Sequence, residues 1–390
     1  MAASEEHADI VLLGTTASGK SFLIASLRSC ARWTHGLAAD VTVQLRDEAG
    51  SLGADPVPDA DGNFTLSLHH AEERAWSGRK VLIDATVDNF YRYEVRLSCR
   101  FREQEGEDTT VPYMEAVRIV DTAGGVMLER SRDFGPASQS QKRQERIKTY
   151  RQLIAGARGI VFCYDITETE SFDWIRSFED LEHSIATFDG IRKGEPRRIA
   201  VAFTKTEYLF SLDGRDAVSR ALDRGQMIAR IQRALQRTDS DILMRLQTLE
   251  ARNAGRIEVR CFPTSAFGYV FQNGCANYSH RTNNWLIGDD TIFKAEKGAD
   301  PIGGSEFFGK FWRPMLTIDP FVYAVFGSDP AVQSKFMYTL DEILQPDTAP
   351  AAPDFTAAPD TAPTAPESKA EASFFRILNR AGQKRRDGKG

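Results

Sequence analysis

The sequence predicts an α/β fold in which a mostly parallel sheet is covered by helices on both faces. Short apolar runs alternate along the chain with amphipathic segments, which is the pattern of repeated βαβ units. Gly159–Tyr164, GIVFCY, is apolar throughout, as is typical of a strand buried on both faces. A glycine-containing turn, Gly14–Ser21, separates the first apolar run from the first amphipathic segment. We therefore expect a strand, a tight loop and a helix in this order near the start of the chain.

The pattern places the first strand at Ile10–Leu13 and the first helix at Lys20–Cys30. Tyr91–Phe101 alternates in part, and the polar segment Arg102–Val111 after it predicts a hairpin loop. Helices are expected where apolar residues recur every three or four positions. The remaining strands are expected at Met114–Val120, Gly159–Tyr164, Arg198–Phe203 and Arg256–Phe262, and the remaining helices at Gln141–Ala157, Thr167–Phe188, Arg215–Arg252, Pro314–Phe326 and Val332–Leu344.

Two segments interrupt the strand–helix alternation. Residues 34–89 are rich in Asp and Gly, and residues 268–312 are rich in Asn, Gly and aromatic residues. We interpret both as insertions within one domain that spans residues 1–344. The Pro/Ala-rich segment 345–372 cannot bury enough apolar surface to fold, so it is expected to be a disordered linker. It leads to a basic C-terminal segment, 373–390.

Charge and cysteine usage narrow the class of protein. The chain has 390 residues and a net charge of −6, which argues against a protein that coats nucleic acid. None of its five cysteines forms a CxxC pair, which favours core thiols in a reducing compartment. The N-terminus lacks the apolar region of a signal peptide, and no apolar run approaches the length of a membrane span. A cytoplasmic location is therefore expected.

The turn after the first strand matches the phosphate-binding loop pattern, Gly14-x-x-x-x-Gly19-Lys20-Ser21. Its glycines let successive backbone N–H groups point at one phosphate, and the following helix directs its positive end at the same anion. Lys20 is expected to reach the β- and γ-phosphates, and Ser21 to coordinate Mg²⁺. The predicted nucleotide contacts of this segment are Gly14, Thr15, Thr16, Ala17, Ser18, Gly19, Lys20, Ser21 and Phe22.

A second phosphate-related motif, Asp121-Thr-Ala-Gly124, follows the apolar strand AVRIV. An acid at a strand end can hold Mg²⁺ through water, so Asp121 is a candidate metal ligand together with Ser21. Gly124 can offer its N–H to the γ-phosphate when the loop moves. Lys20, Asp121 and Gly124 are therefore the predicted catalytic residues.

The order of these motifs resembles that of the Ras-like GTPases of the translation-factor-related (TRAFAC) class. The phosphate loop, DTAG, YDIT…SF, TKTE and TSA occur in the family's order between Asp9 and Phe267. Among larger relatives, the chain looks most like bacterial proteins called double-GTPase or GTPase-associated-system proteins. The resemblance implies a Ras-like P-loop NTPase three-layer sandwich, with a mostly parallel sheet, one antiparallel strand and the two insertions.

The resemblance also implies which residues read the base. In the family an Asn/Thr-Lys-x-Asp motif places a carboxylate on guanine N1 and N2 and a lysine stem over the base. Here the motif is Thr204-Lys205-Thr206-Glu207, in which Glu207 keeps the charge but adds a methylene. Ser265-Ala266 resembles the family's SA motif, whose backbone contacts the guanine oxygen. GTP or GDP is the expected ligand, and the choice between GTP and ATP depends on how Glu207 is placed.

Two features of the sequence, compared with the Ras family, affect the expected chemistry. Gly125 stands where the Ras family usually has the glutamine that orients the attacking water, so hydrolysis should be slow in isolation. A nearby group or a partner protein would have to act instead, and the nearby candidates are Glu129, Arg130, Gln139 and Gln141. Thr86 is the expected switch threonine that binds Mg²⁺, although it could equally be a loop threonine with no ligand.

These motifs predict a GTP-binding, Mg²⁺-dependent molecular switch with slow GTP hydrolysis and a protein effector or activator. The basic C-terminal segment could add a weak membrane or partner contact. Two alternatives remain open. GTTASGKS also resembles the GPTASGKT loop of tRNA dimethylallyltransferases, which indicates a P-loop transferase or kinase. Gly125 and Glu207 would also suit a pseudo-GTPase scaffold that binds nucleotide without turnover.

Overall fold

The fold is described from a computed structural model of residues 1–390. The described residues are 8–15, 18–30, 36–37, 41–47, 64–68, 70–71, 91–101, 113–122, 148–167, 182, 195–237, 241–270, 274–279, 284–285 and 312–345.

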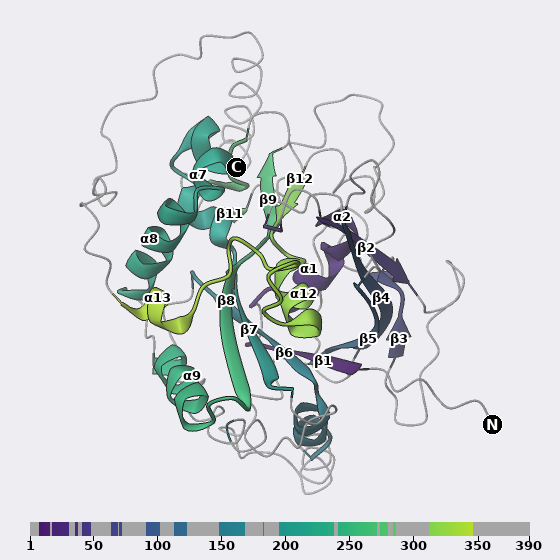
Figure 1. The fold of residues 1–390 in the computed structure, drawn as a ribbon. Coiled ribbons are helices and arrows are strands. Elements are labelled where there is room, and N and C mark those ends of the chain that lie inside the picture. The colour runs from purple at the N-terminus through teal and green to yellow at the C-terminus, as the bar shows by residue number, and fades with distance from the viewer. Residues whose placement is uncertain are drawn as a thin grey trace, which may run out of the picture.

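The architecture is an eight-stranded sheet with helices on both faces (Figure 1). The strand order is β2-β4-β5-β1-β6-β7-β8, and β3 pairs with β4 beside this path. The strands are β1 (Ala8–Leu13), β2 (Val41–Asp47), β3 (Phe64–Leu66), β4 (Tyr91–Phe101), β5 (Tyr113–Asp121), β6 (Gly159–Asp165), β7 (Arg197–Thr204) and β8 (Ile257–Pro263). All the strands expected from the sequence are present; β8 is shifted by one residue from its expected range, and each of the others is equal to or slightly longer than its range.

The sheet has a parallel part and an antiparallel part. From β5 through β1, β6, β7 and β8, every pairing is parallel. β4 is antiparallel to both β5 and β2, and β3 is parallel to β4. The expectation of a single antiparallel strand was therefore wrong, because β3 also runs against the parallel strands. The additional strands come from the first insertion, where β2 and β3 extend the sheet past β4.

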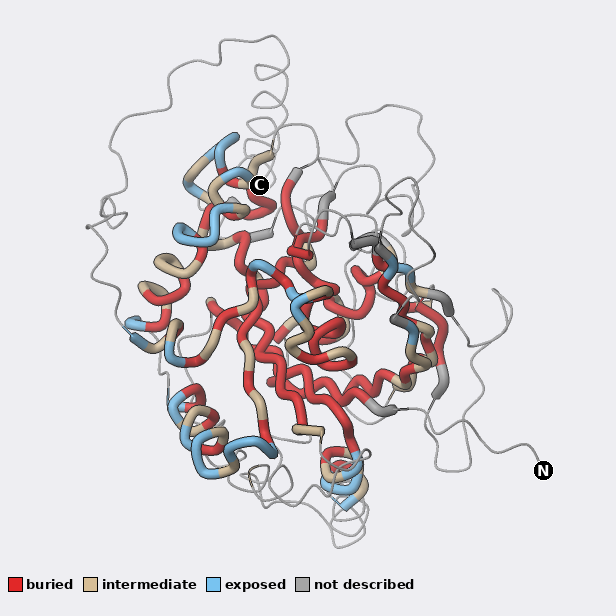
Figure 2. The backbone as a smooth tube through the Cα atoms, viewed as in Figure 1, coloured by how far each residue is buried: buried red, intermediate tan, exposed pale blue. Residues whose placement is uncertain are grey.

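Two apolar cores, one on each face of the sheet, make the three layers. On one face the sheet packs against helical residues 148–156, α8 (Arg224–Leu235), α9 (Asp241–Arg252) and α13 (Leu340–Leu344). On the other it packs against α1 (Lys20–Ala25) and α12 (Asp319–Phe326). β6 and β7 are buried along their whole length (Figure 2), as the continuous apolar run of β6 predicts.

The second insertion contributes small strands near the end of the sheet. β9 (Ser265–Val270) pairs with β12 (Trp312–Met315), and β10 (Tyr278–Ser279) pairs with β11 (Asn284–Trp285). Tyr278 of β10 meets the ring of Tyr208 edge-on, with 4.9 Å between the ring centroids. An aromatic contact thus joins this insertion to the domain.

Several expected helices are shorter than predicted. The first helix breaks at Ser26 into α1 and α2 (Leu27–Cys30). The segment expected as one long helix over Arg215–Arg252 forms the 3₁₀ turn η3 (Gly214–Asp216), α7 (Ala217–Ala221), α8 and α9. Asp223 separates α7 from α8, because its side chain accepts a hydrogen bond from Gln226 N and caps the new helix.

The two closing helices also begin later than expected. Pro314 and Met315 belong to β12, and α12 begins only at Asp319. In the last predicted helix only α13 is helical, because Tyr338 forms a backbone bridge with Cys261 of β8. The helix then starts at a capping box on Thr339. Of the expected helix Gln141–Ala157, residues 148–156 are helical. Most of Thr167–Phe188 and all of Arg102–Val111 lie outside the described residues.

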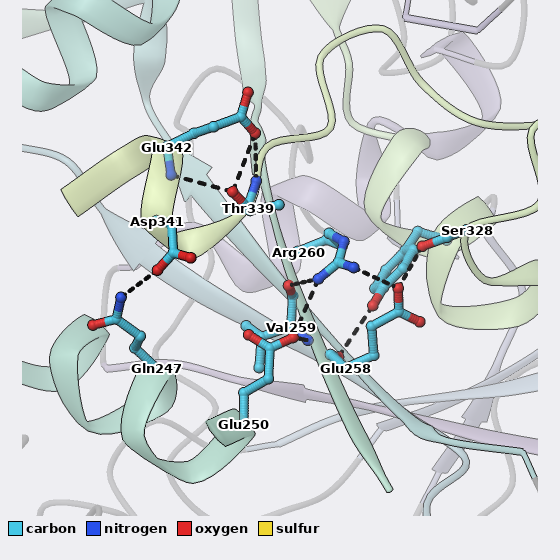
Figure 3. Close-up of polar contacts among 10 residues, drawn as sticks. Gln247, Glu250, Glu258, Val259, Arg260, Ser328, Thr339, Asp341 and Glu342 are labelled. Atoms are coloured by element: carbon cyan, nitrogen blue, oxygen red, sulfur yellow. Dashed lines mark hydrogen bonds and ion pairs between the residues drawn. The ribbon is translucent and has the colours of Figure 1, made fainter. Parts of the chain in front are cut away.

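Polar contacts fasten the C-terminal part of the domain to β8 (Figure 3). Arg260 of β8 lies between Glu250 of α9 and Glu258 of its own strand, with N–O distances of 3.2 and 2.8 Å. Ser328, just after α12, donates a hydrogen bond of 2.6 Å to Glu258. The helices on the two faces of the sheet are therefore tied together through the edge strand β8.

Within the described residues, none of the helices combines the length and apolar character that crossing a membrane requires. The side chains of four of the five cysteines are described, and all four are free thiols. Three of them, Cys99, Cys163 and Cys261, are buried in the strands, as the apolar runs around them predict.

Asp319 is a buried carboxyl group at the start of α12. Its Oδ2 accepts a hydrogen bond from Ser334 Oγ at 2.5 Å, and within the described residues its Oδ1 has no hydrogen-bond partner. Burial raises the pKa of Asp319 from 3.8 to about 7, against the opposing effects of the Ser334 bond and the positive charge of Lys335. The carboxyl group therefore keeps its proton in the folded chain over a pH range in which the unfolded chain has lost it.

We predict that Asp319→Asn removes a pH-dependent loss of stability. Between about pH 4 and pH 7 the folded state binds more protons than the unfolded state, so the free energy of unfolding of the natural chain falls as pH rises. At pH 8 the variant should be more stable than the natural chain, by at most about 4 kcal/mol. Near pH 4 the advantage should vanish. Urea unfolding at a series of pH values measures this, with the exposed Asp216→Asn as control. If the free energies of unfolding of Asp319→Asn and the natural chain differed by the same amount at every pH, the raised pKa of Asp319 would be contradicted.

Candidate functional site

The predicted site lies at the carboxyl end of the parallel strands. β1 pairs in parallel with β5 on one side and with β6 on the other. The chain runs from β1 to strands on both sides of it, so β1 ends at a point where the strand order reverses. Ligands of open α/β sheets bind in the crevice outside the strand ends at such a point. The loop after β1, the end of β5 and the end of β7 all reach this place.

The phosphate-loop residues form a tight turn around the Lys20 side chain. Lys20 is buried, and its Nζ donates hydrogen bonds to the carbonyl oxygens of Gly14 at 2.8 Å and Thr15 at 2.7 Å. A Cβ atom on Gly14 would lie 2.4 Å from Ser18 Oγ and 2.9 Å from the carbonyl oxygen of Cys163. Gly19 has φ 88°, in the left-handed region that favours glycine. Glycine is therefore required at position 14 by close packing and favoured at position 19 by the backbone conformation.

The interior of this loop has an orphaned polar group. Ser18 Oγ is buried and has no hydrogen-bond partner within the described residues. The neighbouring Cys163 does not compete as a reactive group, because burial raises the pKa of its thiol to about 12 and keeps it protonated at neutral pH. A small cradle with a buried ammonium group and an unsatisfied hydroxyl suits an oxyanion such as phosphate.

Ser21 and Asp121 meet although 100 residues separate them in the sequence. Ser21 Oγ donates a hydrogen bond of 2.8 Å to Asp121 Oδ2. The next residue, Thr122, is also anchored to β1, since its Oγ1 donates to the carbonyl oxygen of Leu12 at 2.5 Å. A hydroxyl and a carboxylate are hard oxygen donors of the kind that Mg²⁺ takes in phosphate sites. The two predicted metal ligands that the structure describes are thus adjacent and fit this ion.

The first half of the base-reading motif is tied to the phosphate loop. Thr204 Oγ1 donates a hydrogen bond of 2.8 Å to the carbonyl oxygen of Ser18. Lys205 adopts a left-handed conformation with φ 63°, and its ammonium group pairs with Asp165 at the end of β6. Asp165 also accepts hydrogen bonds from Thr167 N and Oγ1 at 2.9 and 2.7 Å. The lysine stem is therefore held at both ends.

The second half of the motif is joined to the SA motif. Glu207 is fully buried at the start of the 3₁₀ turn η2 (Thr206–Phe210), and Ser265 Oγ donates to its Oε2 at 2.5 Å. Thr206 N donates to the carbonyl oxygen of Thr264 at 3.2 Å. Two segments that are 58 residues apart in the sequence thus form one unit, with a carboxylate directed at Ser265.

The structure brings together most of the predicted site residues that it describes. Gly14, Thr15, Ser18, Gly19, Lys20, Ser21, Asp121, Thr204, Lys205, Glu207 and Ser265 are linked by the contacts above, and Phe22 and Ala266 adjoin them in sequence. Other predicted residues lie outside the described residues: Thr16, Ala17, Thr86 and Gly124, together with Gly125 and the catalytic candidates Glu129, Arg130, Gln139 and Gln141. Their placement in the site stays a prediction.

Two residues of the site were missed by the sequence analysis. Asp165 was given no role of its own and occurred only within the YDIT motif, yet it pairs with the ammonium group of Lys205. Its position at the carboxyl end of β6 could have identified it. Phe267 was not assigned a role, yet its ring packs against Phe22 with 4.6 Å between the ring centroids. No sequence signal indicates this contact, because it depends on how β9 passes α1.

Known proteins offer only a distant match to this chain. No model of a protein family matches it, and no curated protein is significantly similar to it. Among solved structures, one similar chain belongs to the signal recognition particle receptor SRb-GTP/SRX complex from Chaetomium thermophilum. The two chains are 12% identical, and the match covers 67% of this chain and 92% of that chain with a TM-score of 0.28. A likeness at this level carries no argument about function.

We predict that Gly14→Ala strongly destabilises the domain. The new methyl group would contact the carbonyl oxygen of Cys163, which cannot move without displacing the buried strand β6. We expect a loss of about 1–3 kcal/mol, the usual cost of overpacking. Thermal unfolding measures it against the control Gly156→Ala, where a Cβ atom would meet nothing within 4 Å. Equal melting temperatures for the two variants would show that the loop is not packed in this way.

Proposed function

We propose that this protein is a guanine-nucleotide-binding switch that uses Mg²⁺ and hydrolyses GTP slowly. The observation that carries the proposal is the hydrogen bond between Ser21 and Asp121. It joins the phosphate-loop helix to the end of a neighbouring parallel strand and places two oxygen donors side by side at the switch point of the sheet. This pairing has no evident role in packing, whereas a phosphate-bound Mg²⁺ would use both groups.

The phosphates would be bound by groups that already converge on the loop. Lys20 Nζ donates hydrogen bonds to the carbonyl oxygens of Gly14 and Thr15. Phosphate oxygens carry more negative charge than these carbonyls, so charge-assisted bonds to the β- and γ-phosphates would be the stronger ones. Ser21 and Asp121 would hold Mg²⁺, which when bound neutralises charge on the phosphate oxygens.

The base would be read by the joined TKTE and TSA segments. Glu207 is fixed by Ser265, so its carboxylate is oriented before a ligand arrives. A carboxylate can accept two hydrogen bonds from guanine N1 and N2, but adenine presents no matching pair of donors, and this difference favours guanine. The Lys205 stem, held by Asp165, would cover the base. Thr204 links these base contacts to the phosphate loop through Ser18.

Switching would act on the segments next to the ends of β4 and β5, beside Tyr91 and Asp121. Thr86 and Gly124 lie just beyond those ends, so contacts with Mg²⁺ and the γ-phosphate would order both segments together. Hydrolysis would release them. A change in these segments is what a protein effector or activator would recognise.

We expect a fluorescent guanine nucleotide to bind the purified full-length chain in the presence of Mg²⁺ and to be displaced by GTP but not by ATP. Glu207→Gln should lower the preference for GTP over ATP by about tenfold or more, because a carboxylate acceptor for two donors is lost. Glu207→Asp is the matched variant: it keeps the charge but shortens the side chain, so it should lower the preference less than Glu207→Gln does. Displacement by ATP alone, or no nucleotide binding, would overturn the proposal and favour the transferase or scaffold alternatives.

Hydrolysis is tested separately by phosphate release from GTP. We expect a rate of about 10⁻⁴ s⁻¹ or slower, comparable to an unassisted small GTPase, because Gly125 offers no side chain to orient water. The release should disappear in Lys20→Ala and persist in the control Lys335→Ala, whose side chain lies over the Phe336 ring. A chain that binds GTP but shows only background release would instead be a pseudo-GTPase.

A further inference from the structure

Two aromatic rings meet between the phosphate end and the base end of the proposed nucleotide site. Phe22 follows Ser21 directly in the first turn of α1, and Phe267 lies two residues after Ser265 in β9. The ring centroids are 4.6 Å apart with the planes tilted by 51°. Both side chains are only half-buried. A large apolar pair therefore stays partly open to solvent beside polar groups that are assigned to the ligand.

The position of Phe267 is produced by a bulge in β9. The register pairs Arg313 with Tyr269 and Met315 with Ser265, so three residues of β9 lie opposite Pro314 alone. Proline has no N–H to donate to the ladder, which explains why the pairing is interrupted there. Gly268 adopts φ 62° within the bulge. Bulges of this kind re-aim a side chain and are frequent next to active sites.

The same bulge fixes the base-reading carboxylate. Gly268 N donates a hydrogen bond of 2.7 Å to Ser265 Oγ, which in turn donates to Glu207 at 2.5 Å. Asn277, from the second insertion, supports the bulge by donating through its backbone N to the carbonyl oxygen of Gly268 at 3.2 Å. One turn of chain thus sets the direction of a buried carboxylate and of a half-exposed aromatic ring.

We propose that Phe22 and Phe267 form an aromatic wall on which the purine base of the bound nucleotide stacks. The inference rests on the proposed function and adds the group that binds the face of the base, whereas Glu207 binds its edge. Stacking uses the π-face that all purines share, so the wall contributes affinity for the nucleoside without choosing between guanine and adenine. It makes no contribution to binding of the phosphates, which are held by the loop around Lys20.

The test compares a nucleotide with a ligand that has phosphates but no base. GDP and inorganic tripolyphosphate are each titrated, with Mg²⁺, against the full-length chain carrying Phe267→Leu or Phe22→Leu. We expect GDP affinity to fall about tenfold, in the range found for loss of base–aromatic stacking, and tripolyphosphate affinity to stay unchanged. Phe267→Tyr keeps the ring and should keep GDP affinity.

Phe326→Leu is the matched control, because Phe326 is another half-buried ring on the same face of the sheet. Phe326 ends α12, and the neighbouring Val325 carbonyl oxygen accepts a hydrogen bond from Arg198. Arg198 lies at the end of β7 opposite Thr204, so the affinities for GDP and for tripolyphosphate should both stay unchanged. Unchanged GDP affinity in folded Phe267→Leu would overturn the aromatic wall while leaving the proposed function intact. A wild-type chain that binds tripolyphosphate but no nucleotide would overturn both.

Discussion

The parallel pairing of β1 with strands on both sides is the constraint on which the site depends. Because β5 and β6 both run alongside β1, the loop after β1 can reach the end of either neighbour. Ser21 uses this on one side by bonding Asp121 at the end of β5, and Gly14 on the other by packing against Cys163 of β6. A residue with any side chain at position 14 would force the loop out of this crevice. The packing of Gly14 against β6 therefore also keeps the loop where Ser21 can bond Asp121.

The second insertion is part of the base-reading end rather than an appendage to it. β9 begins at Ser265, so the strand that enters the insertion also carries the hydroxyl bonded to Glu207. β12 returns the chain to the domain and leads into α12. A ligand that moves Glu207 would therefore act on both ends of the insertion. This arrangement connects β9 and β12, which lie at the two ends of the insertion, to Glu207.

The local parts of this architecture could be predicted from the sequence, and the non-local parts could not. The phosphate loop is encoded by residue types at fixed spacing, and GIVFCY is a short, wholly apolar run rich in β-branched and aromatic residues, which favours a buried strand. The placement of Asp121 in the site was predictable because the carboxyl ends of neighbouring parallel strands lie at the same edge of a sheet. The pairing of β2 and β3 with β4 depends on partners far along the chain and has no local signal. The single long helix expected at Arg215–Arg252 does not form, and the reason is local. The Asp223 side chain caps the start of α8, and aspartate is more favourable in a cap than in a helix interior.

The extra methylene of Glu207 need not weaken base recognition if its backbone lies further from the base than an aspartate's would. The turn η2 that carries Glu207 is fastened to α8. Arg230 of α8 donates to the carbonyl oxygen of Leu209 at 2.6 Å and pairs with Asp213 at 2.6 Å, while its guanidinium covers the ring of Phe210. Because both partners of Arg230 lie within or just after η2, α8 would set how far the turn stands from a bound base. A longer carboxylate on a turn held back by Arg230 would reach the same atoms as a shorter one on a turn that stands closer.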